Sequence, residues 1–280
     1  MVELFPQKKS FPWSQLPHPL LQYREAVDQD LTHYKAVFHE SLMELMKDHT
    51  IQGRCLFPGA GFVEMALAAE LRELGGRKSL AHGVSLSGIS FLEPFDLTVG
   101  MELMCHVSKS QGIEFRPADD DTRVVCSISK ASTGNRSVAE APPKLSVLKQ
   151  RCVVEVPDIA ERYFELEAQE FHRKRFQTLE HVYRNTAGTE MLANLRLPID
   201  SERYHIHPAL LDGVIQLGGF VDEIMSAAAG MDDYIAIRRG NGKAWVPMGI
   251  GEVQLFKSGA QLMNDSSSSN LLRRSDFSFN

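Results

Sequence analysis

The chain has 280 residues, 43% of them hydrophobic, and a formal net charge of −6. This length suits one large domain or two small ones, each with a real core. The basic residues are scattered, which argues against a nucleic-acid partner, because phosphate binding needs clustered lysine and arginine. No apolar run approaches the roughly 20 residues that span a bilayer, and the N-terminus lacks the apolar core of a signal peptide. We therefore expect a cytoplasmic protein that does not contact membranes.

The cysteines show no metal-binding pattern. There are four: Cys55, Cys105, Cys126 and Cys152. None forms a C-x-x-C pair or has a histidine at ligand spacing, so we interpret them as small buried hydrophobic residues. Cys55 adjoins a histidine motif, but a nucleophilic role is disfavoured because no base lies beside it in the sequence. The short basic run Arg173–Arg175 is interpreted as a solvated turn, with contact to an acidic partner as the alternative.

Residue patterns predict alternating strands and one long helix in the first half. Prolines and aromatic residues predict an irregular linker over residues 1–17. Aromatic and branched residues predict a strand over Tyr34–Leu42, and Pro58-Gly59 opens a helix that continues to Leu74. Three further strands are predicted: Val84–Phe91, Met101–Val107 and Arg123–Ser129.

The second half is predicted to repeat this plan. Small residues and paired prolines around residues 131–144 set the boundary between the halves. The predicted elements after it are a helix at Asp158–Glu170, strands at Phe176–Tyr183 and Glu190–Leu197, a long helix at Ala209–Ala229 and a strand region at Ala244–Phe256. Each half would surround one long helix with strands, so a structural duplication is inferred without clear self-similarity of the residues.

The first candidate catalytic segment runs from His49 to Gly59, HTIQGRCLFPG. His49 can be neutral near pH 7 and accept a proton. Gly53 and Gly59 allow close backbone approach to a ligand. The helix that begins after Pro58 presents free N–H groups suited to a carbonyl that gains negative charge. The alternative interpretation is a structural histidine before an ordinary proline at a helix start.

The second candidate segment is HPALLDGVIQ, from His207 to Gln216. Asp212 and Gln216 are four residues apart, so on a helix their side chains meet on one face. The neighbours are apolar, and burial favours the protonated form of a carboxyl, which can then donate a proton near neutrality. The alternative is a surface aspartate stabilised by the helix dipole.

Together these segments resemble a known family. HPLL at 18–21, H-x-x-x-G-x-x-x-x-P at 49–58 continuing as GAGFVEMALAA, and HPALLD-x-x-x-Q at 207–216 occur in one order and separation. This set is similar to the dehydratase domains of modular and iterative polyketide synthases, over roughly residues 18 to 256. The resemblance implies an α+β double hot-dog fold, in which two curved antiparallel sheets each wrap around a long central helix. Its expected parts are a linker (1–17), an N-terminal half (18–135), a linker (136–150), a C-terminal half (151–257) and a flexible or divergent tail (258–280).

The resemblance also implies a reaction, the removal of water from a β-hydroxyacyl thioester. His49 would take the α-proton and Asp212 would protonate the departing hydroxyl, with Gln216 holding Asp212 and the Gly59 N–H facing the thioester carbonyl. Further supporting positions are Gly53, Pro58, His207 and Pro208. The substrate would arrive on the phosphopantetheine of an acyl carrier protein, and no metal, flavin or nicotinamide cofactor is expected. Other synthase domains and a second copy in a homodimer are the expected partners.

Two features depart from the family pattern. Family members usually carry G-Y-G-P-x-F before the second-half strands, where this chain has Phe171–Gln177, FHRKRFQ. His172 would take the place of the tyrosine and Phe176 would keep the aromatic residue, so positive charge is expected beside an apolar substrate tunnel. Family members also continue with several more strands where this chain has a Ser/Asn-rich tail.

Two alternatives to an active dehydratase are considered. One is a same-fold isomerase or cyclase, whose relatives often change the glutamine that this chain keeps as Gln216. The other is a catalytically degenerate domain kept for structure or carrier docking, which the altered segment 172–175 and the tail would support.

Overall fold

The computed structural model describes residues 18–26, 29–74, 84–132, 145–188, 190–225, 234–239 and 242–255. Its largest sheet has seven antiparallel strands in the order β1-β2-β6-β7-β8-β5-β14. These strands are β1 (Tyr23–Ala26), β2 (Leu31–Val37), β5 (Val84–Phe91), β6 (Glu102–Ser108), β7 (Gly112–Pro117), β8 (Cys126–Ser132) and β14 (Gly249–Leu255). A three-stranded sheet and two hairpins contain β9 (Val154–Val156), β10 (Leu179–Arg184), β11 (Met191–Leu195), β12 (Tyr234–Arg239), β13 (Gly242–Pro247), β3 (Thr50–Ile51) and β4 (Arg54–Cys55).

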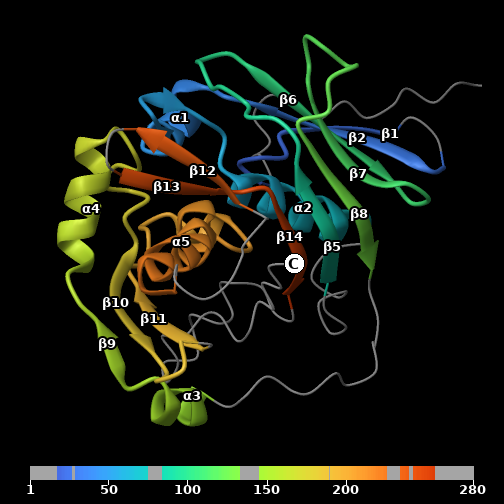
Figure 1. The fold of residues 1–280 in the computed structure, drawn as a ribbon. Coiled ribbons are helices and arrows are strands. Elements are labelled where there is room, and N and C mark those ends of the chain that lie inside the picture. Colours follow the sequence, from blue (N-terminus) through green and yellow to red (C-terminus); the bar gives the residue numbers. More distant parts are fainter. Residues whose placement is uncertain are drawn as a thin grey trace, which may run out of the picture.

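Two long helices organise these sheets (Figure 1). The helices are α1 (Glu40–Met46), α2 (Gly59–Glu73), α3 (Leu145–Arg151), α4 (Ile159–Ala168), the 3₁₀ turn η2 (Ser201–Arg203) and α5 (Pro208–Met225). Helix α2 contacts β5 and β6 of the large sheet, whereas α5 contacts β11 and β13, and the two helices also contact each other. Among the described helices, none combines the length and apolarity needed to cross a bilayer.

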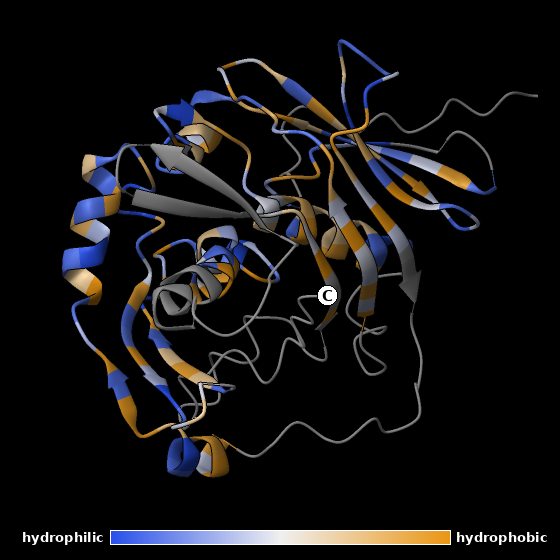
Figure 2. Cartoon of the chain, in the orientation of Figure 1, coloured by the Kyte–Doolittle hydropathy of each residue, from blue (hydrophilic) through white to orange (hydrophobic). Residues whose placement is uncertain are grey.

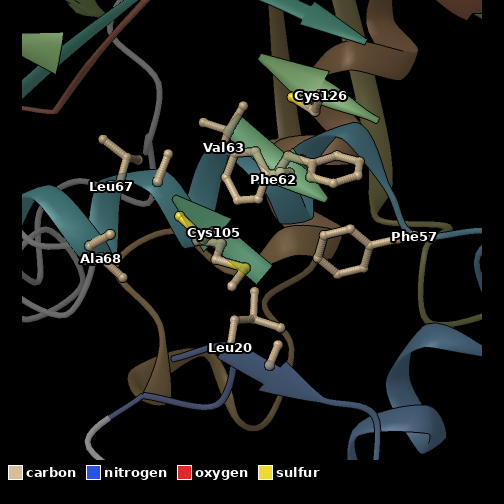
Figure 3. Packing of buried hydrophobic residues seen from close by; sticks show 14 of the residues in the cluster. Leu20, Phe57, Phe62, Val63, Leu67, Ala68, Cys105 and Cys126 are labelled. Atoms are coloured by element: carbon tan, nitrogen blue, oxygen red, sulfur yellow. The ribbon is translucent and has the colours of Figure 1, made fainter. Parts of the chain in front are cut away.

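Helix α2 is buried almost all round, as expected of a central helix enclosed by a sheet. Figure 3 shows Phe62 and Val63 of α2 close to Cys105 of β6 and Cys126 of β8. The Phe62 ring stacks edge-to-face on Phe115, with centroids 5.1 Å apart. Several alanines of α2 belong to the same buried cluster, and their small side chains leave room for the strands. The core of the first half is therefore formed by α2 and the face of the large sheet that covers it.

The outer helix α4 is amphipathic, in contrast to α2. Ile159 and Tyr163 are buried and pack in a small cluster with Leu179 and Val182 of β10. The remaining surface of α4 is mostly polar, which Figure 2 shows as blue with orange patches. Helix α4 therefore covers one side of the three-stranded sheet and presents its polar side to solvent.

Strand β14 joins the sheet of the other half. It follows α5 in the chain, yet it pairs antiparallel with β5, with Ile250 opposite Ile89 and Val253 opposite Leu86. Both Ile250 and Val253 are buried in the main core. A strand from the C-terminal part of the chain therefore belongs to the same sheet as the strands of the first half, so a boundary along the chain would not separate the sheets.

Most predicted elements are confirmed, with some corrections. The helix after Pro58 and the strand Val84–Phe91 have the predicted bounds within one residue. The strand predicted at Tyr34–Leu42 is wrong in its second part, since β2 ends at Val37 and α1 begins at Glu40. Strands β1, β3, β4, β7, β9 and β12 were not predicted, and α3 lies in the predicted linker. The predicted linker 1–17 and tail 258–280 lie outside the described residues.

A buried carboxylate on α2 holds the segment that leads into α5. Glu64 is fully buried, and its oxygens accept hydrogen bonds from the His205 and Ile206 N–H groups at 2.6 and 2.8 Å. The His18 ring Nε2 donates to the same carboxylate at 2.9 Å, since its Nδ1 accepts the Leu20 N–H. Three donors on two distant segments therefore converge on one residue of the central helix.

We predict that Glu64→Ala destabilises the fold by about 2–5 kcal/mol, because it leaves two buried N–H groups and a histidine without their acceptor. Urea unfolding followed by circular dichroism measures this loss. The control is Glu44→Ala, which removes a solvent-exposed carboxylate paired with Lys47 and should leave the transition midpoint nearly unchanged. Equal midpoints for the Glu64 variant and the unmodified protein would contradict the assigned role.

Candidate active site

His49 is held in one orientation by its own hairpin. It follows α1 and begins the β3–β4 hairpin, where its ring Nδ1 donates to the Leu56 carbonyl at 2.8 Å. The Leu56 N–H donates back to the His49 carbonyl at 3.2 Å. Because a carbonyl only accepts, Nδ1 carries the proton of the neutral ring and Nε2 keeps its lone pair. The ring is 5% exposed, so this lone pair lies in a water-poor environment.

Asp212 lies in the second turn of α5. His207 precedes the helix and caps it, since its Nδ1 accepts the Ala209 N–H at 3.1 Å and its carbonyl accepts the Leu210 N–H. Pro208 occupies the first helical position, where the missing N–H costs nothing. Burial lowers the pKa of His207, which is consistent with a neutral capping ring. His207 and Pro208 therefore start the helix that carries Asp212, and in this way they support the candidate site.

The two candidate catalytic groups face each other. His49 Nε2 lies 3.7 Å from Asp212 Oδ1, and both side chains are almost fully buried. The distance exceeds that of a direct hydrogen bond, so each group keeps its reacting atom free for a third partner. The residues come from different halves of the chain, as the sequence predicts for a site between the halves.

Gln216 fixes the Asp212 carboxyl, and a tyrosine fixes Gln216. The Gln216 Nε2 donates to Asp212 Oδ2 at 2.6 Å and to the Phe176 carbonyl at 3.0 Å. Its Oε1 accepts the Tyr163 hydroxyl at 2.7 Å, and that hydroxyl accepts the Leu179 N–H at 3.2 Å. The sequence does not identify Tyr163, because its contact with Gln216 joins residues 53 positions apart and leaves no local pattern.

The segment 171–176 brings a second histidine to the site. Its backbone is docked on the first half, where the His172 N–H donates to the Thr50 carbonyl at 3.0 Å. His172 has a φ of 23°, an unfavourable conformation for a residue with a side chain. Its Nε2 lies 3.5 Å from Asp212 Oδ2, and its ring centroid lies 5.0 Å from that of His49.

The expectation of positive charge at His172 is wrong. Burial lowers the pKa of His172 to about 4, and the nearby Asp212 carboxyl only partly opposes this shift. The ring is therefore neutral near pH 7. The charged neighbours Arg173, Lys174 and Arg175 are exposed, as predicted for a solvated turn. Phe176 is fully buried and packs edge-on against His49, with centroids 5.1 Å apart.

The contacts of the other predicted site positions belong to turns, helix starts and the core. Gly53 lies in the turn of the β3–β4 hairpin with a φ of 75°, and its N–H donates to the Glu170 carbonyl rather than facing His49. Pro58 caps α2 and Gly59 is its first residue, where an added Cβ would lie 2.8 Å from the Phe91 ring. Burial raises the pKa of the Cys55 thiol, which disfavours a nucleophilic thiolate. All four cysteines are free.

Comparisons with known proteins identify the family and the fold. A family model described as polyketide synthase dehydratase domain matches residues 18–128, and one described as polyketide synthase dehydratase N-terminal domain matches residues 140–271. The chain belongs to the polyketide synthase dehydratase domains. It is 23% identical to polyketide synthase PksN of Bacillus subtilis (strain 168) over 254 residues, which is 86% of this chain and 4% of that relative. The chain thus spans a small part of the relative it matches.

Solved dehydratase domains have the same fold. The dehydratase domain from the CurF module of curacin polyketide synthase superimposes with a TM-score of 0.67 at 19% identity, over 86% of this chain and 84% of that one. The dehydratase domain from the CurK module gives 0.63 at 18% identity, over 86% and 82%. The fold is therefore the double hot-dog, as the resemblance implied.

The neutral state of His172 predicts a pH-dependent loss of stability. An unfolded histidine takes up a proton near pH 6.5, whereas folded His172 resists protonation until about pH 4, so stability falls as the pH drops through this window. Between pH 7 and pH 5 the contribution is about 2 kcal/mol of unfolding free energy. His172→Phe removes the titrating group. The free energy of unfolding, measured with urea at pH 7 and at pH 5, should then fall by about 2 kcal/mol less than it does in the unmodified protein. The same pH dependence in both proteins would contradict the assigned pKa.

Proposed function

We propose that this chain removes water from a β-hydroxyacyl thioester carried on the phosphopantetheine of an acyl carrier protein, giving the α,β-unsaturated thioester during polyketide assembly. The observation that carries the proposal is the 3.7 Å approach of His49 Nε2 and Asp212 Oδ1 in a buried site. One group has a free lone pair, and the other has a carboxyl oxygen that can hold a proton. An elimination of water needs a base that removes the α-proton and an acid that protonates the departing hydroxyl.

His49 acts as the base in this proposal. Its Nε2 takes the α-proton, while the Nδ1–H to the Leu56 carbonyl stabilises the ring as it gains charge. The electron pair of the broken C–H bond moves toward the thioester carbonyl. The Gly59 N–H, at the start of α2 and not used within the helix, is the proposed donor to that oxygen.

Asp212 acts as the acid. Its protonated carboxyl gives the proton to the β-hydroxyl as the C–O bond breaks, so that water leaves instead of hydroxide. Gln216 holds one oxygen of the carboxyl and leaves the other directed at His49. After turnover His49 holds a proton that Asp212 lacks, and the short separation of the two groups allows its return through the released water.

Relatives support these roles. Solved forms of the CurK dehydratase that carry a histidine-to-phenylalanine or an aspartate-to-asparagine substitution are described as inactive mutants. The carrier protein, the neighbouring synthase domains, a homodimer and a cytoplasmic location are proposed for this chain from its family. Gln216 is retained and bonded to Asp212, which favours the dehydratase over an isomerase or cyclase of the same fold.

Turnover of a β-hydroxyacyl pantetheine thioester, followed by mass spectrometry, tests the reaction. We expect a product lighter by one water. An isomer of unchanged mass would indicate the isomerase or cyclase, and absence of any product would indicate a degenerate docking domain.

His49→Gln and Asp212→Asn should each lower kcat by roughly 10²–10⁴-fold, because each removes one proton-transfer group. Both substitutions keep the approximate size of the side chain, and circular dichroism checks that the fold is intact. The control is His181→Gln, which changes an exposed histidine on β10. Full activity of the Asp212 variant would place the acid elsewhere.

Tyr163→Phe tests the support of the acid. The substitution removes the hydroxyl's bonds to Gln216 and to the Leu179 N–H, and a loss of about 1 kcal/mol in the support of Gln216 corresponds to about a fivefold decrease in kcat. KM should change little if the tyrosine acts through Gln216 and Asp212 and does not touch the substrate. A decrease that appears only in KM would contradict this positioning role.

A further inference from the structure

The site contains a third group that the proposed elimination does not use. His172 Nε2 lies 3.5 Å from Asp212 Oδ2, on the opposite carboxyl oxygen from His49. The ligand atoms of His49, His172 and Asp212 all lie within 4.8 Å of one another. Within the described residues this is the one histidine, cysteine and carboxylate group with such spacing.

We propose that His49, His172 and Asp212 form a binding site for a divalent transition-metal ion of the zinc type. Two imidazoles and one carboxylate are a ligand set that zinc accepts, with the fourth position left for water or substrate. The ligand atoms of a tetrahedral zinc ion with bonds of about 2.0–2.1 Å lie about 3.3 Å apart. His172 Nε2 lies 3.5 Å from Asp212 Oδ2, and His49 Nε2 lies 3.7 Å from the other oxygen, Oδ1. Since the three ligand atoms lie within 4.8 Å of one another, closing them around one ion requires a rotation of the carboxylate and a closer approach of the two imidazoles.

Neighbouring groups hold two of the three side chains in place. The His49 Nδ1–H is held by the Leu56 carbonyl, so Nε2 is the nitrogen that is free to bind. The Gln216 amide holds the Asp212 carboxyl. His172 has an unfavourable φ, and its segment is held against the first half by hydrogen bonds, of which the His172 N–H to the Thr50 carbonyl is one.

Metal binding would inhibit the reaction, a part of the inference that rests on the proposed function. A zinc ion would occupy the His49 lone pair and an Asp212 oxygen, the two atoms that the elimination needs. The domain would then be switched off by zinc and restored by a chelator.

Equilibrium dialysis of the untagged protein against zinc, followed by metal analysis, tests the binding without any substrate. We expect one zinc ion per chain, and cobalt in its place should give the visible absorption of a four- or five-coordinate ion. His172→Phe and Asp212→Asn each remove a proposed ligand and should weaken zinc binding by at least about tenfold. That is the smallest loss seen when only a residue that supports a ligand is changed. The control His181→Phe should bind as the unmodified protein does.

Absence of bound zinc, or binding by His172→Phe equal to that of the unmodified protein, would overturn the site. Dehydration measured separately in the presence of chelator tests the proposed function, so the two can fail independently. Zinc bound at this site without any slowing of dehydration would overturn the inhibitory role.

Discussion

The active-site geometry depends on a buried carboxylate that ties the two long helices together. Glu64 on α2 accepts the His205 and Ile206 N–H groups, which belong to the segment just before α5. That segment continues into the cap at His207, and Asp212 follows one turn later. The position of Asp212, the proposed acid, is therefore set from the central helix of the first half. Helix α2 is itself buried almost all round, so this anchor lies in the core of the first half.

A second set of contacts holds His49, the proposed base, from the second half of the chain. The hairpin that contains His49 receives the backbone of segment 171–176, so the first half supports residues of the second. Phe176 packs on the His49 ring, and its carbonyl accepts the amide of Gln216. Each half thus holds a proposed catalytic residue of the other, and strand β14 pairs with a strand of the first half. These contacts between the halves place His49 and Asp212 next to each other in the buried site.

Local patterns predicted much of this architecture, and long-range pairing explains what they missed. The helix after Pro58 and the strand Val84–Phe91 were identified because their periodicity and boundary residues lie in the segments themselves. The pairing of β14 with β5 and the contact of Tyr163 with Gln216 join residues far apart in the sequence, so no local signal marks them. The charge expected at His172 was wrong because burial, which the sequence does not display, keeps its ring neutral.

The central claim is that His49 and Asp212 act as one unit on one substrate, and a double-mutant cycle on kcat tests it most directly. His49→Gln, Asp212→Asn and the double variant are compared with the unmodified protein. If the two residues act together, the double variant should be about as slow as the slower single variant, because the reaction is already lost when either partner is missing. Losses that multiply, as for independent residues, would contradict the account.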